Sequence, residues 1–305
     1  MRCIMAVGLL AALSLTACGG GSATTSETPS GGTPGTADRS YDVSGIVKDD
    51  NIAAMLPAGV TSKGTLVIGA ATDYAPAEFR GEDLRTPIGY DVDLGKAIGR
   101  TLGLESSVEH GEFASLLPGI GTKYDIGISS FTVTSERTAA YDMIAYITVG
   151  SSFAVQKGNP KGFNPDDVCG ATIGVQTGTY QVEQLETLTA ECSSAGKQPV
   201  EVLSYPLQSD VTTNLVGGKL DALYADSTVS DYATVLTSGQ LEVVGGVREA
   251  ASQGIVVSKN DPQLTAAIQA AMQKLMDDGT WSKILESWGI STEAGLSTAE
   301  LNPQA

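Results

Sequence analysis

The sequence predicts an α/β protein with two lobes, in which the second lobe is inserted into the first. From Lys63 onward, short apolar runs alternate with helical patterns, which is typical of largely parallel strands covered by helices. A complete strand–helix set lies between about 158 and 248, and the strand segments on either side of it both fit an outer lobe. This order along the chain predicts two crossings between the lobes.

Short apolar runs mark the predicted strands of the folded region. They read TLVIGA from 65, YDIGISS from 124, SSFAVQK from 151, ATIGVQT from 171, VEVLSY from 200, DALYAD from 221 and GIVVSK from 254. Runs of this length that are rich in β-branched and aromatic residues are typical of strands. The intervening stretches therefore have to supply the helices and turns.

Two of those stretches have the one-face spacing of amphipathic helices. In the first, the repeating face carries Leu94, Ala97, Ile98, Thr101 and Leu102. In the second, it carries Leu264, Ala267, Ile268, Ala271, Met272, Leu275 and Met276. Asp261 and Pro262 are start signals for this second helix, and Gly279 is its stop signal.

The first eighteen residues have the pattern of an export signal. Arg2 precedes an apolar run that ends at Leu15 and is too short to span a bilayer, and small residues lead to Cys18. The ending LTAC resembles the lipobox of bacterial lipoproteins, which implies lipid attachment at Cys18 and a position on the extracytoplasmic face of the cell membrane. The alternative is an ordinary cleavage site with an unmodified thiol.

Composition divides the remaining chain. Residues 19–40 are Gly, Ser, Thr and Pro with almost no apolar side chain, so they cannot bury enough surface to fold. The predicted parts are a signal at 1–18, a flexible tether at 19–62, lobe 1 at 63–156 and 250–291, lobe 2 at 157–249, and a C-terminal tail at 292–305.

The net charge and the cysteines indicate which partners and which cellular compartment to expect. The formal charge is −17, so the surface should repel phosphate backbones, and nucleic acid is not an expected partner. Of the four cysteines, Cys3 leaves with the signal and Cys18 carries the lipid. Cys169 and Cys192 remain, and in an oxidising compartment this pair predicts a disulfide.

One short stretch, ISSFTVTSERTAAYD at 128–142, admits two interpretations. Thr134 can cap a helix, and Glu136 suits the positive end of a helix dipole. Neither explains Arg137, which can hold a carboxylate with hydroxyl groups nearby or form an ion pair with Glu136 or Asp142. The hydroxyl side chains beside it belong to Ser129, Ser130 and Thr132.

Five segments in order resemble one known family, the periplasmic-type solute-binding proteins of amino-acid ABC importers. They are YAPAEF from 74, IGYDVDLGKAIGRTLG from 88, FASLLPGIGTKYDIGISSFTVTSER from 113, IGVQTGTYQ from 173 and LDALYADSTV from 220. The resemblance implies the type II periplasmic-binding-protein fold, whose two lobes close over one amino acid. It also implies delivery of the ligand to an ABC permease. We expect a monomer because nothing in the sequence suggests a larger assembly, and we expect no cofactor and no metal.

The resemblance assigns roles to particular residues. Arg137 is expected to hold the ligand α-carboxylate, with Ser129, Ser130 and Thr132 adding contacts from the same lobe. Asp226 is expected to pair with the α-ammonium, although it could instead cap the helix that follows it. The remaining contacts are expected from the backbone of Thr179 and Tyr180, and from the rings of Tyr74 and Phe113, which could alternatively pack a lobe core.

Selectivity for the ligand side chain is predicted from three positions. Ala77 stands where many relatives have Phe, which leaves more room. Ala71 stands where relatives selective for cationic side chains often carry Asp. Glu78 could provide a negative wall or face solvent. These positions favour a polar ligand, either neutral or cationic.

Two rival functions remain open at this stage. A few relatives of this fold are cyclohexadienyl or arogenate dehydratases, for which the acids to test are Glu78 and Glu112. The only histidine, His110, is expected in a solvated loop, and the parts of a serine hydrolase or zinc hydrolase are missing. We therefore expect a non-enzyme. The other rival is a surface lipoprotein that senses a ligand with the same pocket.

Overall fold

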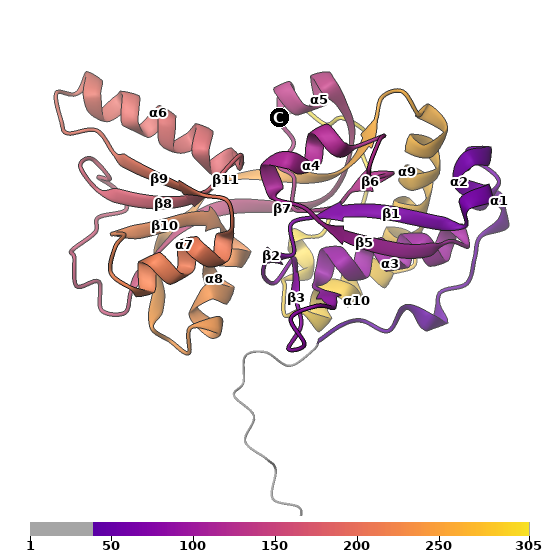
Figure 1. Ribbon diagram of the computed structural model, residues 1–305, viewed down its shortest axis with the longest axis horizontal. Helices are drawn as coiled ribbons and strands as arrows, with labels where there is room; N and C mark the ends of the chain where they lie inside the picture. The colour runs from indigo at the N-terminus through magenta and orange to yellow at the C-terminus, as the bar shows by residue number, and fades with distance from the viewer. Residues whose placement is uncertain (1–38, 305) are drawn as a thin grey trace, which may run out of the picture. The chain divides into compact units, whose positions relative to one another are not determined.

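The structure is a computed structural model that describes residues 39–304. Its main sheet has the strand order β5-β1-β6-β11-β7-β10-β8-β9, and two lobes are built on the two ends of this sheet (Figure 1). β7 (Tyr141–Gln156) and β11 (Leu241–Ser258) are long antiparallel partners that run through both lobes. They are the two crossings that the sequence predicts, and their pairing is irregular between Val244 and Ala251.

Lobe 1 carries the parallel strands β1, β5 and β6. Their bounds are Thr65–Ala70, Glu105–His110 and Ile126–Gly127. A second small sheet contains β2 (Asp73–Tyr74), β3 (Glu78–Arg80) and β4 (Pro87–Ile88). The helices are α3 (Tyr90–Leu102), α4 (Phe113–Gly119), α5 (Ser135–Ala140), α9 (Pro262–Asp277), α10 (Thr280–Ser287) and the short 3-10 helix η2 (Thr292–Ala294).

Lobe 2 carries the parallel strands β8, β9 and β10. They span Thr172–Gln176, Glu201–Tyr205 and Ala222–Asp226, and β10 also pairs antiparallel with the far end of β7. Three helices complete the lobe: α6 (Tyr180–Ser194), α7 (Gln208–Val216) and α8 (Ser227–Leu236). The predicted disulfide is confirmed, because Cys169 and Cys192 are bonded in this lobe.

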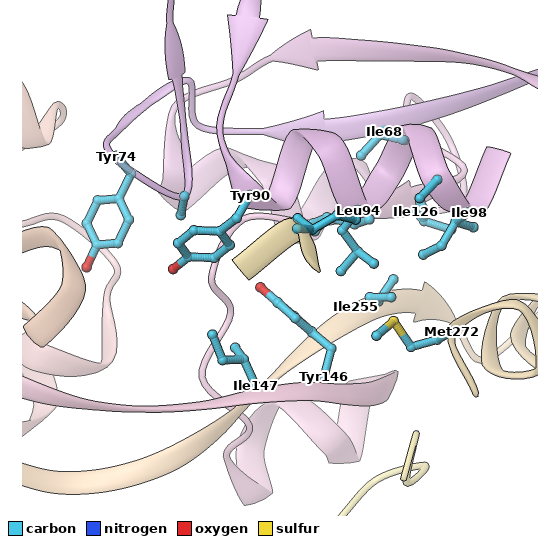
Figure 2. Close-up of a cluster of buried hydrophobic side chains, with 14 of the residues drawn as sticks. Ile68, Tyr74, Tyr90, Leu94, Ile98, Ile126, Tyr146, Ile147, Ile255 and Met272 are labelled. Atoms are coloured by element: carbon cyan, nitrogen blue, oxygen red, sulfur yellow. The ribbon is translucent and has the colours of Figure 1, made fainter. Parts of the chain in front are cut away.

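The predicted helical faces form the core of lobe 1. Figure 2 shows Leu94 and Ile98 of α3 pointing toward Ile255 of β11 and Met272 of α9. These side chains are fully buried. Asp261 also caps α9 as predicted, since its carboxylate accepts a hydrogen bond from Leu264 N at 3.0 Å.

The tether predicted over 19–62 is wrong for the part that the structure describes. Residues 39–62 include η1 (Val43–Gly45), α1 (Asp50–Ala53) and most of α2 (Ala58–Lys63). Leu56 and Val60 are buried against the core of lobe 1. The physical reason is that apolar side chains reappear from Tyr41 onward, so this part can bury surface.

The two ends of the chain differ in how much of them the structure describes. The signal, Cys18 and the first part of the tether lie outside the described residues. The predicted tail at 292–305 runs along β7 as far as it is described, where Gly295 bridges to Ile147 and Leu301 to Ile144. No helix within 39–304 combines the length and apolar character needed to cross a membrane.

Candidate functional site

A small cavity lies where lobe 1 faces lobe 2. From lobe 1 it is lined by Tyr74, Phe113, Ser130, Thr132 and Arg137. From lobe 2 it is lined by Thr179, Tyr180, Gln181 and Asp226. The structure thus brings together every residue predicted to contact a ligand, except Ser129.

Arg137 enters this cavity from the first turns of α5. Thr134 caps the helix as predicted, because its hydroxyl accepts a hydrogen bond from Arg137 N at 3.2 Å. The guanidinium donates to Thr132 O at 2.8 Å and, across the lobes, to Gly178 O at 3.1 Å. It also lies 5.8 Å from the centre of the Phe113 ring. The stretch at 128–142 is therefore both a helix cap and one wall of the cavity.

The guanidinium of Arg137 is a buried charge that could match an anion. Arg137 is 8% exposed, and burial lowers its pKa. Among residues 39–304, the ion pairs do not include Arg137, so the alternative pairing with Glu136 or Asp142 is wrong. Asp142 instead accepts hydrogen bonds from Thr265 and Asn302. A carboxylate entering the cavity would provide the missing opposite charge.

Asp226 supplies the opposite charge on the lobe 2 side. It ends β10 and precedes α8, but its side chain makes no capping hydrogen bond, so the capping alternative is wrong. Its carboxylate accepts from Gln181 Nε2 at 2.8 Å and Gln253 Nε2 at 2.7 Å. Burial raises the pKa of Asp226 to about 6, although hydrogen bonds from Gln181, Gln253 and Tyr74 oppose that rise.

The two predicted aromatic residues both line the cavity and pack within the protein. Tyr74 is 5% exposed, and its hydroxyl accepts a hydrogen bond from Asp226 N at 3.2 Å, so it reaches the other lobe. Phe113 stacks on Phe131 with ring centres 5.0 Å apart. Tyr74 and Phe113 therefore both line the cavity and pack against other residues of the protein.

Ser130 lines the cavity, whereas its neighbour Ser129 does not. Ser129 lies behind the cavity, where its hydroxyl donates to Glu78 Oε1 at 2.6 Å and accepts from Ala71 N at 3.0 Å. Ser130 lines the cavity with a φ of +50°, and its backbone N donates to Asp91 Oδ2 at 2.8 Å. Asp91 therefore holds the unusual backbone that presents Ser130.

The three predicted selectivity positions do not line the cavity. Ala71, Ala77 and Glu78 are each fully buried within lobe 1. Glu78 does not face solvent either, because it lies beside Asp91 and bonds to Ser129. Burial and the negative charge of Asp91 raise the pKa of Glu78 well above its usual range. The prediction that these three residues contact the ligand side chain directly is therefore wrong.

The entrance of α6 forms the lobe 2 end of the cavity. Thr179 is the N-cap residue and Tyr180 begins the helix, as the pattern predicts. The Thr179 hydroxyl donates to Gln176 O at 2.8 Å, so this side chain already has a partner within lobe 2. Thr179 N also donates to Gln176 O, at 3.4 Å. The backbone amides of Tyr180 and Gln181 are therefore the groups at this turn that are available to an anion.

Sequence reasoning missed three residues that shape the site. Gln181 follows the predicted turn directly, so its position in the motif could have signalled it. Asp91 lies in the segment IGYDVDL, but nothing there shows that it supports Ser130. Gln253 lies on β11, one residue before the predicted strand GIVVSK, and no sequence pattern distinguishes it from a packed residue.

The residues considered for catalysis lie outside the cavity. His110 is the last residue of β5 and is exposed, with Nδ1 accepting from Thr72 N at 3.3 Å. His110 is exposed as expected, but it is the last residue of a strand and not part of a loop. Glu112 precedes α4 and is exposed. Across residues 39–304, no group of His, Cys, Asp and Glu is arranged to hold a metal ion.

The chain is similar to known proteins over most of its length. Residues 66–291 match the model of bacterial extracellular solute-binding proteins, family 3. An arginine-binding protein of Corynebacterium glutamicum is 36% identical over 256 residues, which covers 83% of each chain. An L-cystine-binding protein of Escherichia coli is 27% identical, covering 75% of this chain and 84% of its own.

A solved structure agrees in fold. An ancestral arginine-binding protein bound to arginine is 28% identical, with a TM-score of 0.67, covering 74% of this chain and 98% of its own. The curated relatives named here are binding proteins and not enzymes.

Proposed function

The chain belongs to family 3 of the bacterial extracellular solute-binding proteins, and from this premise we propose that it captures a polar amino acid between its lobes. The single observation that supports the proposal most strongly is the placement of Arg137 and Asp226 in one small cavity, on opposite lobes. Their charges match the two ends of an amino-acid zwitterion. Capture of a ligand that both lobes touch would favour the closed arrangement.

The α-carboxylate is assigned to Arg137. A planar guanidinium can donate two parallel hydrogen bonds to a carboxylate, and this one has no carboxylate partner among the described residues. A bound carboxylate would compete with the carbonyl of Gly178, which now accepts from Nη2. The backbone amides at the start of α6 lie on the same cavity and would share the negative charge.

The α-ammonium is assigned to Asp226. Two of its acceptor positions are taken by Gln181 and Gln253, which leaves lone pairs on both oxygens for an ammonium. An ammonium would also offset the burial that now raises the pKa of this carboxyl. Tyr74 and Phe113 then enclose the rest of the ligand with their rings.

L-Arginine is the first candidate ligand. The reported relatives are named for arginine and L-cystine, and the chain shares most of its length with both. The formal charge of −17 also favours encounter with a cationic ligand over an anionic one. The proposed ligand class, polar amino acids, also includes neutral ones.

We further propose that the protein is a lipid-anchored monomer on the extracytoplasmic face of the membrane, and that it delivers its ligand to an ABC permease. The lipobox-like ending at Cys18 supports the anchor. The family to which the chain belongs supports the transport role. Radiolabelled lipid incorporation that depends on Cys18 would support the anchor, and incorporation into a Cys18→Ser protein would contradict it.

Thermal unfolding with a ligand panel tests the binding function. The full-length protein is heated with each of the twenty amino acids, L-cystine, ornithine, citrulline, prephenate and arogenate. A ligand that binds only the folded state stabilises it by about 2.7 kcal/mol at a hundredfold excess over its dissociation constant. We expect L-arginine to raise the midpoint. A shift only with prephenate or arogenate, or formation of an aromatic product from either, would contradict the proposal.

A further inference from the structure

Asp73 of lobe 1 caps a helix that belongs to lobe 2. Its Oδ2 accepts a hydrogen bond from Gln208 N, the first residue of α7, at 2.6 Å. The residue in the N-cap position, Leu207, has no side-chain hydrogen bond to offer. Figure 1 shows β2 and α7 side by side at this point. The helix therefore takes its cap from a residue that is distant in sequence and lies in the other lobe.

This contact is partly shielded from water. Gln208 is 3% exposed, and both polar atoms of its side chain are buried without a partner among the described residues. Asp73 Oδ1 is likewise buried without a partner. Burial raises the pKa of Asp73 to about 6, while hydrogen bonds from the amides of Gln208 and Ser209 oppose the rise. A carboxylate in this position is well placed for the positive end of α7.

This contact is separate from the ligand cavity. Asp73 and Tyr74 are neighbours on β2, and successive side chains of a strand point to opposite faces. Tyr74 lines the cavity with Asp226, whereas Asp73 and Gln208 line a separate pocket between β2, α7 and α8. A ligand held by Arg137 and Asp226 would therefore not replace the cap.

The contact also depends on how the lobes are arranged. In the main sheet, β7 and β11 are the strands that run through both lobes, so rotation about them would separate β2 from α7. Separation would leave the first amides of α7 without a side-chain acceptor. The cap therefore contributes free energy to the closed arrangement and none to an open one.

We propose that Asp73 is a latch for lobe closure, a positioning residue that tightens ligand binding by capping α7 without touching the ligand. The proposal rests on the proposed function, because closure is what makes binding tight. An N-cap lost to alanine weakens a helix by an amount that corresponds to roughly two- to thirtyfold in an equilibrium constant. Loss of the latch should appear mainly in the dissociation rate, since it stabilises the complex after closure.

The test compares the full-length parent with three variants. Asp73→Ala removes the cap. Asp73→Asn keeps an oxygen acceptor and should restore most of the effect, because Asn is a good cap. Asp210→Ala is the matched control, since Asp210 lies in the first turn of the same helix and is exposed. It removes a negative charge from the end of α7 without removing a contact between lobes.

Two readouts separate a latch from a merely structural residue. The first is the affinity and dissociation rate of L-arginine. The second is the distance between dyes on non-natural amino acids at Thr122 of lobe 1 and Glu186 of lobe 2, both exposed. The dye distance is measured without ligand in increasing sucrose, which is excluded from protein surface and so favours closure.

For Asp73→Ala we expect roughly two- to thirtyfold weaker arginine binding with faster dissociation, and a closed population that needs more sucrose to form. Asp73→Asn should have an affinity and a closed population close to those of the parent, and Asp210→Ala should match the parent in both. An Asp73→Ala protein with parental affinity and closure would overturn the proposal, as would an equal loss in Asp210→Ala. If arginine does not bind the parent, the proposed function fails, but the sucrose series still decides whether the latch exists.

Discussion

Gln253 Nε2 donates a 2.7 Å hydrogen bond to Asp226 Oδ2, which joins the crossing strand β11 to the end of β10. Gln253 is 1% exposed, so this bond is shielded from water. Together with Gln181 it opposes the burial that raises the pKa of Asp226 to about 6. A side chain of the hinge thus helps to keep Asp226 in the ionised form that attracts an ammonium.

Replacing Gln253 should therefore weaken binding through Asp226. Gln253→Leu keeps a similar volume but removes the donor, so the pKa of Asp226 should rise further. We expect L-arginine binding at pH 7 to weaken roughly ten- to hundredfold, which is the usual effect of losing a hydrogen bond to a charged group. Titration calorimetry measures this. Gln269→Leu is the control, because Gln269 bonds to Ala299 O within lobe 1. Parental affinity in Gln253→Leu would show that the bond has no role in binding.

Binding should depend on pH through Asp226. Its pKa is about 6 in the ligand-free protein, against an ordinary value of 3.8, and a bound ammonium would lower it again. Below pH 6 the ligand must displace a proton, so affinity should fall by up to about tenfold per pH unit. Above pH 6 this contribution should be constant. Calorimetry between pH 4.5 and 8 measures how L-arginine affinity changes with pH. In Asp226→Asn the affinity should not fall below pH 6 in this way.

The same pKa has the opposite effect on folding. Because the folded-state pKa of Asp226 lies above its ordinary value, the folded protein holds this proton more tightly than the unfolded chain does. The contribution of Asp226 to the free energy of unfolding should therefore grow as pH falls from 6 toward 3.8. Unfolding of Asp226→Asn should be less dependent on pH in this window. A parent whose affinity and stability change in the same direction through Asp226 would contradict this assignment.

Arg137 should be irreplaceable for binding but not for folding. Arg137→Lys keeps the charge but loses the fork that donates two parallel hydrogen bonds, and Arg137→Ala loses both. We expect at least a hundredfold weaker L-arginine binding in Arg137→Ala and a smaller loss in Arg137→Lys. Thermal unfolding without ligand should change less than binding does, because relief from burying a charge without an ion-pair partner offsets the loss of the hydrogen bonds to Thr132 O and Gly178 O. Arg85→Ala, at an exposed loop position, is the control. Equal affinity in parent and Arg137→Ala would remove Arg137 from the site.

The disulfide should stabilise lobe 2 without affecting recognition. Cys169 and Cys192 are 23 residues apart in sequence, and a cross-link closing such a loop contributes about 3 kcal/mol in the chain-entropy account. Replacing both by Ser should lower the denaturant midpoint by a corresponding amount. Arginine affinity measured well below that midpoint should be unchanged, because neither cysteine lines the cavity. A large loss of affinity in the folded variant would show that the bond also positions α6.

The sequence was most informative where a local pattern has one physical solution. The faces of α3 and α9, the cap at Thr134 and the pairing of Cys169 with Cys192 each follow from spacing or chemistry along the chain. Arg137 and Asp226 were placed by the resemblance of whole motifs to a family. Local reasoning alone leaves Arg137 open between an ion pair and a ligand contact, and Asp226 open between a helix cap and a ligand contact.

What could not be predicted depends on which way a side chain points and on contacts between distant segments. Glu78 was expected at the cavity or in solvent, but it points into lobe 1 toward Ser129. The bonds of Gln253 to Asp226 and of Asp73 to Gln208 join segments 27 and 135 residues apart. No periodicity along the chain encodes such pairs, because they arise only when segments distant in sequence come together in the folded protein.

The measurement that tests the central claim most directly is calorimetric titration of the full-length protein with L-arginine and with agmatine, which has the same side chain but no α-carboxylate. If Arg137 holds that carboxylate and Asp226 holds the α-ammonium, L-arginine should bind and agmatine should bind at least a hundredfold more weakly, as for breaking a desolvated charge pair. Citrulline, which keeps the zwitterion and loses the side-chain charge, then reports on selectivity alone. Agmatine binding as tightly as L-arginine would contradict recognition of the zwitterion by Arg137 and Asp226.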